Sequence, residues 1–409
     1  MEVLHPVCAG LDIHKESVVA CVRHIAQGKV GTQVRTFKTT TQELPVLSEW
    51  LAQHGATHIA MEATGIYWKP VWHILSDGEF QLVLANAAHA KNLPGRKTDV
   101  NDATWLADLM AHGLIRASFV PDEPTQQMRA LLRTRKQMVG ERSSHTQRIQ
   151  KTLEDANIKL DTVVTDILGL SGRRILEALI AGQTMPQALA ALAHRNIKAS
   201  ADLAASLRGR VRAHHRFLLK LHLDQIDAID TAIASIDKEV DGNIEPFRQA
   251  IERLSAIPGF SQLAARVLVS EIGIDMSRFE TAGHLVSWAG LCPRNDESAG
   301  KRRSTRMRQG APWLKTTLIQ CAWAAARTQG SDFQAQYHRL RSRSGAKKAI
   351  GAVAAALLTT AYHMVKNGSE YQDLGPNHFD QQAKARHVLG LVNRLENLGF
   401  EVQIALKAA

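Results

Sequence analysis

The order of strand and helix patterns at the start of the chain constrains its fold more than any other feature. Residues 7–13, 17–24 and 29–38 are rich in β-branched and apolar residues and are separated by polar or glycine-containing turns, which predicts three consecutive strands. Helix and strand patterns then alternate: a helix around residues 44–51, a strand at 58–62, a helix at 67–75 and a strand at 80–86. A three-strand meander followed by such alternation predicts a mixed α/β sheet.

Four acidic residues fall where this order brings segments of the chain together. The order is that of the ribonuclease-H-like fold, in which the fourth strand lies beside the first. Asp12 is in the first predicted strand and Glu62 ends the fourth. Asp99 and Asp102 open the next amphipathic stretch, where a spacing of three residues puts them on one helix face. We expect these four carboxylates to converge, and Asp108, farther along the same helix, to face solvent.

The four acids predict a divalent-metal site. Mg²⁺ prefers hard oxygen ligands, and two Mg²⁺ ions can activate an attacking oxygen and stabilise a leaving one during phosphodiester cleavage. Singly, Asp12 could be a strand-end acid and Asp99 a helix N-terminal acid, so the prediction depends on their joint position. Phosphate would be attracted by three nearby cations: Lys91, Arg96 and Lys97. Zinc is disfavoured because no H-x-H or H-x-x-x-H pair occurs among the neighbouring histidines: His14, His73 and His89.

The middle of the chain is predicted to be helical, with two heptad-like rows. The first row is Leu132, Val139, Thr146, Leu153 and Leu160, and the second is Leu219, Ile226, Ile233 and Val240, with His222 interrupting its companion row. The two stretches could form an antiparallel hairpin, a coiled coil between subunits, or the core seams of a helical bundle. Three cations share one face of the first stretch and are candidates to contact a nucleic-acid backbone: Arg129, Arg133 and Lys136. A solvated basic helix face is the alternative.

The last third combines a Pro-Gly turn with a strongly basic segment. The turn Ile257-Pro258-Gly259-Phe260 precedes a helical pattern and looks like one arm of a helix-hairpin-helix, so backbone N–H groups near Gly259 are candidates to bind phosphate. Residues 300–348 contain twelve Lys and Arg against one acid, Asp332, whereas the rest of the chain is balanced at 38 against 38. This excess predicts a polyanion partner, although a solvated basic face is possible. The candidate contacts are Lys301, Arg302, Arg303, Arg306 and Arg308.

Composition indicates where the protein resides. The four cysteines, Cys8, Cys21, Cys292 and Cys321, form no C-x-x-C pair, and no signal peptide precedes the first strand, so a reducing cytoplasm is expected. The apolar run at residues 349–365 contains Thr, Tyr and His and is interpreted as a buried helix rather than a membrane span. No membrane contact is predicted.

Four segments, taken in order, resemble the DEDD transposases of the insertion sequence one-ten family. They are Gly10-Leu11-Asp12-Ile13-His14-Lys15, Met61-Glu62-Ala63-Thr64-Gly65-Ile66-Tyr67, Lys97-Thr98-Asp99-Val100-Asn101-Asp102-Ala103 and Ile257-Pro258-Gly259-Phe260. A fifth, Ala289-Gly290-Leu291-Cys292-Pro293-Arg294 followed by Glu297-Ser298-Ala299-Gly300-Lys301, resembles the segment that carries the nucleophilic serine of that family. The resemblance assigns this role to Ser298, which composition and spacing alone do not separate from Ser304 or Thr305.

The resemblance implies a transposase that cuts and rejoins DNA. Its domain plan would be a RuvC-like ribonuclease-H-fold domain (1–120), a helical coiled-coil region (121–245), a helical transposase domain with the serine (246–370) and a tail (371–409). The carboxylates would hold Mg²⁺, two ions per site, while Ser298 forms a phosphoserine link to DNA. The implied partners are donor and target DNA, an element-encoded guide (bridge) RNA and further copies of the chain, a dimer assembling to a tetramer. The protein would be cytoplasmic and nucleoid-associated in a bacterium.

Two departures from the family pattern accompany this resemblance. The serine is followed by Ala-Gly where the family commonly has Gly-Gly, and the stretch Gly310-Ala311-Pro312-Trp313-Leu314-Lys315 differs from the usual glycine- and asparagine-rich one. Two other functions remain open: a Holliday-junction-resolvase-like endonuclease that uses the same metal site with water as nucleophile, and a non-enzymatic nucleic-acid-binding scaffold with vestigial acids.

Overall fold

The computed structural model describes residues 2–26, 29–62, 65–85, 102–194, 203–293, 296–304, 306–308, 310–378, 388–389, 391–399 and 401–402. For residues 26, 296–298, 302 and 303 it describes the backbone alone. The chain divides into two compact units, Met1–Val120 and Pro121–Ala409. Each unit is described by itself.

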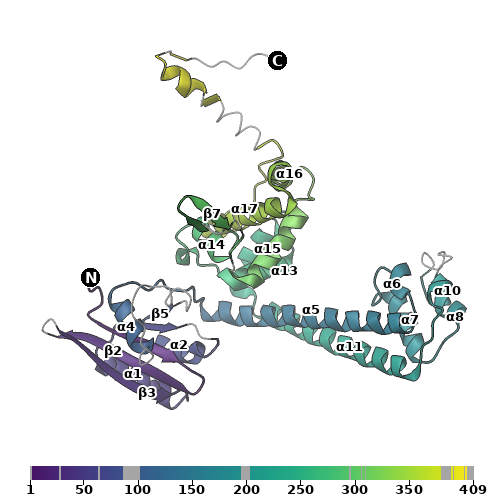
Figure 1. Cartoon of the computed structure of the whole chain (residues 1–409), viewed down its shortest axis with the longest axis horizontal. Coiled ribbons are helices and arrows are strands. Elements are labelled where there is room, and N and C mark those ends of the chain that lie inside the picture. The colour runs from purple at the N-terminus through teal and green to yellow at the C-terminus, as the bar shows by residue number, and fades with distance from the viewer. Residues whose placement is uncertain are drawn as a thin grey trace. The chain divides into compact units, whose positions relative to one another are not determined.

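A five-stranded mixed sheet forms the centre of the N-terminal unit (Figure 1). Its strands are β1 (Val7–Ile13), β2 (Ser17–Ala26), β3 (Lys29–Lys38), β4 (His58–Glu62) and β5 (Gln81–Ala85). Their order in the sheet is β3-β2-β1-β4-β5, with the first three antiparallel and β4 parallel to both β1 and β5. The predicted mixed α/β sheet is therefore confirmed.

Helices cover both faces of this sheet. Helices α1 (Glu43–Gln53) and α2 (Trp68–Ser76) share a core with the alternate β1 residues Ala9, Leu11 and Ile13. Helix α4 (Asp102–Ala111) packs on the opposite face, where Cys8 joins Leu106 and Met110. Since side chains alternate along a strand, Gly10 and Asp12 lie on the face that α4 covers. Strand β1 is buried on both faces for the same reason.

Two long helices dominate the first part of the C-terminal unit. Helix α5 (Glu123–Asp155) and helix α11 (Ala213–Gly242) run antiparallel, as the pairs Arg135 Nε–Asp237 Oδ1 and Arg142 Nε–Asp230 Oδ1, each at 2.6 Å, require. The predicted heptad stretches therefore pair with each other within one chain, and we call this pair the helical hairpin. Four short helices pack at its far end: α6 (Leu160–Val163), α7 (Leu170–Ile180), α8 (Pro186–Ala191) and α10 (Leu203–Ser206).

The buried seam of the hairpin follows part of the predicted rows. Leu153, Leu219 and Ile226 are buried, as heptad positions should be. Val139 is instead 41% exposed and lines a pocket between α5, α13 and α15. The first half of α5 packs against the C-terminal helices rather than along α11 alone, which a heptad count could not predict.

The remainder of the C-terminal unit is mainly helical, as predicted. Its helices are α12 (Arg248–Ser255), α13 (Gln262–Ile272), α14 (Ala282–Trp288), α15 (Pro312–Ala325), α16 (Asp332–Ser344) and α17 (Ala346–Asn367), with short 3-10 helices at Glu245–Phe247 and Met276–Arg278. A small antiparallel ribbon, β6 (Asp296–Ser298) and β7 (Lys301–Ser304), interrupts them. Helix α17 could cross a membrane by length and composition alone, but 56% of its most apolar window is buried inside this unit.

Candidate active site

Two of the four predicted acids lie side by side at the end of the sheet. Strands β1 and β4 are parallel, and their register pairs Leu11 with Met61. The next residues along the two strands are Asp12 and Glu62. Carboxyl ends of neighbouring parallel strands meet at one edge, so the backbone brings these carboxylates together. Both side chains are partly buried, with Asp12 23% exposed.

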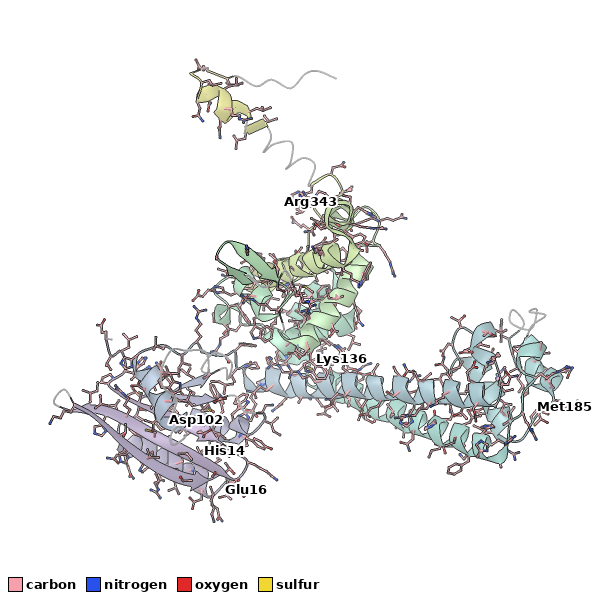
Figure 2. All side chains as sticks on the ribbon, viewed as in Figure 1. His14, Glu16, Asp102, Lys136, Met185 and Arg343 are labelled. Carbon is pink, nitrogen blue, oxygen red and sulfur yellow. The ribbon has the colours of Figure 1, made fainter. Side chains whose placement is uncertain are left out.

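The third acid, Asp102, is the first residue of α4 (Figure 2). Helix α4 approaches β1 most closely at Gly10, where a Cβ would lie 2.5 Å from Ala107 N and nearer still to the carbonyl oxygen of Ala103. Only glycine permits this approach. Because Asp102 precedes Ala103 and Asp12 shares the face of Gly10, Asp12 and Asp102 lie on the same side of the sheet. The fourth acid, Asp99, lies outside the described residues, as do Lys91, Arg96 and Lys97.

His14 is the nearest basic partner that the structure gives to Asp12. Its Nε2 lies 3.3 Å from Asp12 Oδ2, and the His14 side chain is 62% exposed. A histidine so exposed can turn into solvent, so this pair would not keep a cation away from Asp12. The sequence had shown His14 only as a flanking residue without a zinc-binding spacing.

The donor chemistry of this site fits a hard divalent cation. Asp12, Glu62 and Asp102 offer carboxylate oxygens from three separate elements, which is the donor set that Mg²⁺ prefers. Within the described parts of the chain, these three do not all bring an oxygen within 4.8 Å of one another. The carboxylate oxygens are therefore farther apart than the ligands of a single ion. Binding of Mg²⁺ would draw the three carboxylates closer together or divide them between two ions.

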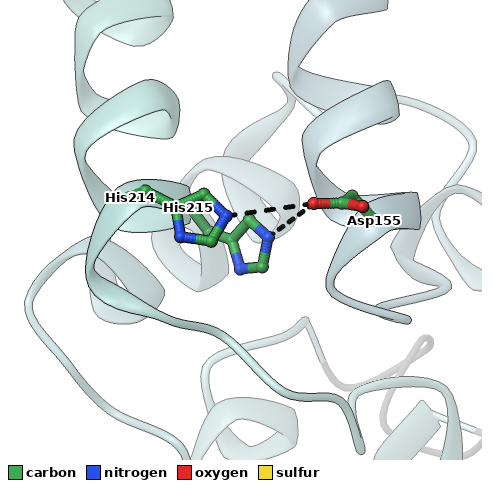
Figure 3. Close-up of side chains that lie close together, drawn as sticks. All are labelled: Asp155, His214 and His215. Carbon is green, nitrogen blue, oxygen red and sulfur yellow. Dashed lines mark hydrogen bonds and ion pairs between the residues drawn. The ribbon is translucent and has the colours of Figure 1, made fainter.

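A different cluster, Asp155, His214 and His215, is tighter, with three ligand atoms within 4.8 Å (Figure 3). His215 Nδ1 accepts a hydrogen bond from the Arg212 backbone N–H at 3.1 Å, so Nε2 carries the ring hydrogen and donates it to Asp155 Oδ2 at 2.7 Å. A metal bound at Nε2 would need the lone pair that this tautomer lacks. The His215 bond also lowers the pKa of the Asp155 carboxyl. The cluster fits a cap that fastens α11 to the end of α5.

Ser298 occupies the last position of β6, directly before a tight turn. The turn residues Ala299 and Gly300 have φ values of +50° and +73°, and Lys301 begins β7. Positive φ values at both residues of a two-residue connection are what a type I′ hairpin requires. Ser298 is thus followed by a defined turn at the backbone level. The Ala-Gly departure from the family pattern also falls on a position where glycine would be less strained.

Three predicted nucleic-acid contacts have partners inside the C-terminal unit. Arg133 donates two bonds to the buried Glu271, at 2.7 and 2.8 Å, and Arg129 donates to the Ser270 and Glu271 carbonyl oxygens. Burial lowers the pKa of Arg129 to about 10. Lys136 Nζ donates to Thr316 Oγ1 at 2.8 Å (labelled in Figure 2). These cations tie α5 to α13 and α15, and a role in nucleic-acid binding stays a prediction.

Gly259 also has a packing role. Its φ is +85°, and a Cβ there would lie 2.6 Å from Ala325 N, so the Pro-Gly turn lies against the backbone of α15. Ser261 Oγ accepts the Ala264 N–H and so caps the helix that follows. In the basic segment, Lys301, Arg306 and Arg308 are exposed, whereas the side chains of Arg302 and Arg303 lie outside the description.

One polar contact behind the site was missed in the sequence. Arg23, 4% exposed, donates Nε to Asp108 Oδ1 at 3.2 Å. Asp108 is half exposed rather than simply solvent-facing, because it partners this buried guanidinium between α4 and β2. A charged residue at a core position of a predicted strand is the signal that could have indicated a partner on the covering helix.

Two protein-family models of transposases match this chain. A family model described as "Transposase", built on DEDD enzymes of the IS110 kind, matches residues 9–158, and a second, "Transposase IS116/IS110/IS902 family", matches residues 251–338. Together they cover more than half of the chain and include the acids and the Ser298 segment. The chain therefore belongs to the IS110 family of transposases. This is the insertion sequence one-ten family that the sequence motifs resemble. This class acts on DNA as a transposase or recombinase, and DEDD transposases are typically metal-dependent.

Individual relatives agree with this assignment. A pilin gene-inverting protein of Moraxella lacunata is 27% identical over 380 residues, covering 88% of this chain and 96% of the relative. A putative transposase, y4qE, of Sinorhizobium fredii is 24% identical over 274 residues, covering 66% of this chain and only 58% of the relative. An uncharacterized 43.6 kDa protein of insertion element IS110 in Streptomyces coelicolor is 24% identical over 313 residues, covering 69% and 74%.

Proposed function

We propose that this protein is the transposase of a bacterial insertion sequence, cutting and rejoining DNA by magnesium-assisted attack of Ser298 on a phosphodiester. The observation that carries the proposal is the meeting of Asp12 and Glu62 at the ends of two parallel strands, with Asp102 opening the helix on the same side. The strand order β3-β2-β1-β4-β5 supports a ribonuclease-H-like, RuvC-like domain around them.

The residues of the chain divide the chemistry between them. Asp12, Glu62, Asp99 and Asp102 would hold the ions, and bound Mg²⁺ would polarise the scissile phosphate and neutralise charge on its oxygens. Ser298 Oγ forms a new bond to phosphorus as the bond from phosphorus to the departing strand oxygen breaks. The serine proton leaves to a base, and the departing oxygen takes up a proton. One phosphoester replaces another, so the phosphoserine link can later be resolved by a strand hydroxyl.

Partners follow from the same proposal. The transposase would bind donor and target DNA and an element-encoded guide RNA, with base pairing supplying sequence recognition and the protein contacting backbone and shape. It would act as a dimer that assembles to a tetramer, with the helical hairpin serving as its coiled-coil region and the α12–α13 turn as a helix-hairpin-helix element. It would reside in the cytoplasm, associated with the nucleoid.

The test is capture of the covalent link. Purified protein is incubated with Mg²⁺, the guide RNA and DNA spanning the ends of the element, and the reaction is denatured to reveal protein bound covalently to DNA. We expect the adduct in wild type, its loss in Ser298→Ala and its retention in Ser304→Ala, the matched serine control in β7. An adduct that persists in Ser298→Ala would contradict the serine mechanism.

A second function is a junction-resolving endonuclease in which water replaces the serine. It is favoured because Asp12, Glu62 and Asp102 all belong to the N-terminal unit, so a metal-dependent nuclease would need no residue of the C-terminal unit. Magnesium-dependent cleavage that survives Ser298→Ala, forms no adduct and disappears in Asp12→Asn would select this function. Binding without cleavage in any of these proteins would select the non-enzymatic scaffold.

A further inference from the structure

The loop after β4 presents two large apolar side chains to solvent. Ile66 is 70% exposed, more than any other large apolar side chain described in the N-terminal unit, and Tyr67 is 40% exposed. The neighbouring Trp68 and Trp72 behave differently, because they pack against the core and contact each other edge to face at 5.8 Å. Packing in the core therefore explains why tryptophans stand at positions 68 and 72. It does not explain why apolar side chains stand at the exposed positions of Ile66 and Tyr67.

The described backbone from Gly65 to Lys69 holds the pair in a defined position. Gly65 has φ +56°, and the Lys69 N–H donates to the Ile66 carbonyl at 3.2 Å, which closes a turn into α2. Atoms Cδ2 and Cε2 of the Tyr67 ring lie 3.8–3.9 Å from where a Cβ on Gly65 would stand. The ring is thus placed along the turn rather than extended freely into solvent.

The position of the loop links it to the candidate active site. Glu62 ends β4, and the Ile66-Tyr67 pair follows it four and five residues later, directly before α2. Residues 63–76 contain Lys69 and no acid, so the loop and helix that follow are compatible with a polyanion. This short separation in the chain allows a nucleotide next to a phosphate at Asp12 and Glu62 to reach the pair.

We propose that Ile66 and Tyr67 bind the DNA base that flanks the scissile phosphate, with Tyr67 stacking on the base and Ile66 entering the step between bases. Aromatic rings stack on unpaired bases of any sequence, and isoleucine is among the apolar wedges that open a base step. Stacking by the Tyr67 ring and insertion of Ile66 do not read a hydrogen-bonding pattern, so the contact suits an enzyme whose target is not specified by protein side chains. The proposal depends on the active-site assignment above.

The test measures contact and affinity separately from cleavage. The probe is a short thymidine oligonucleotide with a single 5-iodouracil, irradiated with the full-length protein in the absence of Mg²⁺, and crosslinked peptides are mapped by mass spectrometry. We expect a crosslink within residues 65–69 in wild type and in Asp12→Asn. Binding should weaken roughly five- to hundredfold in Tyr67→Ser and remain near wild type in Tyr67→Phe.

Matched variants make each outcome decisive. Val34→Ser removes a similarly exposed side chain (49%) from β3, at the far edge of the sheet, and should bind as wild type does. Unchanged binding in both Ile66→Ser and Tyr67→Ser, with crosslinks elsewhere, overturns the proposal. A shift in oligomeric state in these variants without a crosslink would show that a second copy covers the loop, which also overturns it. A wrong active-site assignment would be recognised by a different result, because cleavage would then persist in Asp12→Asn.

Discussion

Single residues decide how closely the elements of the candidate site approach. Gly10 allows the backbone of α4 to lie against β1, which places Asp102 on the side of Asp12. Ala299 accepts a positive φ so that β6 and β7 can turn within two residues of Ser298. The absent side chain of Gly10 thus determines the position of Asp102, and the small side chain of Ala299 permits the turn next to Ser298.

Gly10→Ala should destabilise the N-terminal unit. The added Cβ would meet backbone atoms of Ala103 and Ala107, which cannot rotate away, so α4 must shift from β1. Overpacking of this kind costs about 1–3 kcal/mol, measured as a lower urea midpoint. Gly140→Ala is the control, because a Cβ there would meet nothing within 4 Å and should be neutral or stabilising in the interior of α5. Equal midpoints for wild type and Gly10→Ala would contradict the close approach.

Ala299→Gly should stabilise the β6–β7 turn. Glycine adopts φ +50° without the clash that Ala299 experiences there, which is worth about 1 kcal/mol. We expect a higher thermal midpoint of the C-terminal unit and adduct formation by Ser298 at least equal to that of wild type. Ala299→Val provides the opposite case, since a β-branched residue tolerates positive φ least. A lower midpoint for Ala299→Gly than for Ala299→Val would refute this geometry.

At the scale of elements, the helical hairpin combines apolar packing with a polar interruption. Leu219 and Ile226 are buried in its seam, and Arg135 and Arg142 pair with acids of α11. Between them, His145 Nδ1 and His222 Nδ1 lie 3.2 Å apart, so one ring must carry a hydrogen there and the other must accept it. Burial, then His145 and Arg148, lowers the pKa of His222 below its ordinary 6.5.

The stability of the hairpin should therefore fall in mild acid. Because the pKa of His222 is lower in the folded chain than in the unfolded one, the unfolded chain binds the proton first as the pH drops below 6.5. Urea unfolding measured between neutral and mildly acidic pH should show this loss of stability. The variant His222→Leu should lose less stability in acid, because leucine does not titrate and still packs in the seam of the hairpin. His338→Leu, at an exposed position of α16, should leave the dependence unchanged. If His222→Leu loses as much stability in mild acid as wild type does, the pH dependence belongs to other titratable groups.

At the scale of the whole molecule, the net charge of +11 is concentrated rather than spread. Lys301 is exposed next to the β6–β7 turn, and Arg306 and Arg308 are exposed past the other end of β7. Several cations elsewhere are paired with acids. We expect a chain with this distribution to bind a polyanion mainly through residues 300–348. Its affinity for DNA should accordingly depend on salt through that segment.

Replacing Lys301, Arg306 and Arg308 by alanine should flatten the salt dependence of DNA binding. Each phosphate contact contributes a slope of about 0.9 in a plot of log affinity against log salt, so the triple variant should lose up to roughly 2.7. Fluorescence anisotropy over a salt series measures this slope. The control replaces Lys159, Lys220 and Arg248, whose charges pair with neighbouring acids. Equal slopes for both triple variants would remove the basic segment from the interface.

The sequence alone determined the mixed sheet, the adjacency of the strands that carry Asp12 and Glu62, and the helical middle, because these follow from local periodicity and the order of the elements. It also determined the family, because the family motifs occur in order along the chain. Only the tertiary structure decided that the two heptad stretches pair within one chain, that Glu271 takes Arg133, and that Gly10 and Gly259 make room for a helix. Such choices depend on contacts between residues far apart in the chain. An arginine has the same helical spacing whether it faces a phosphate or a buried glutamate, and only packing separates the two.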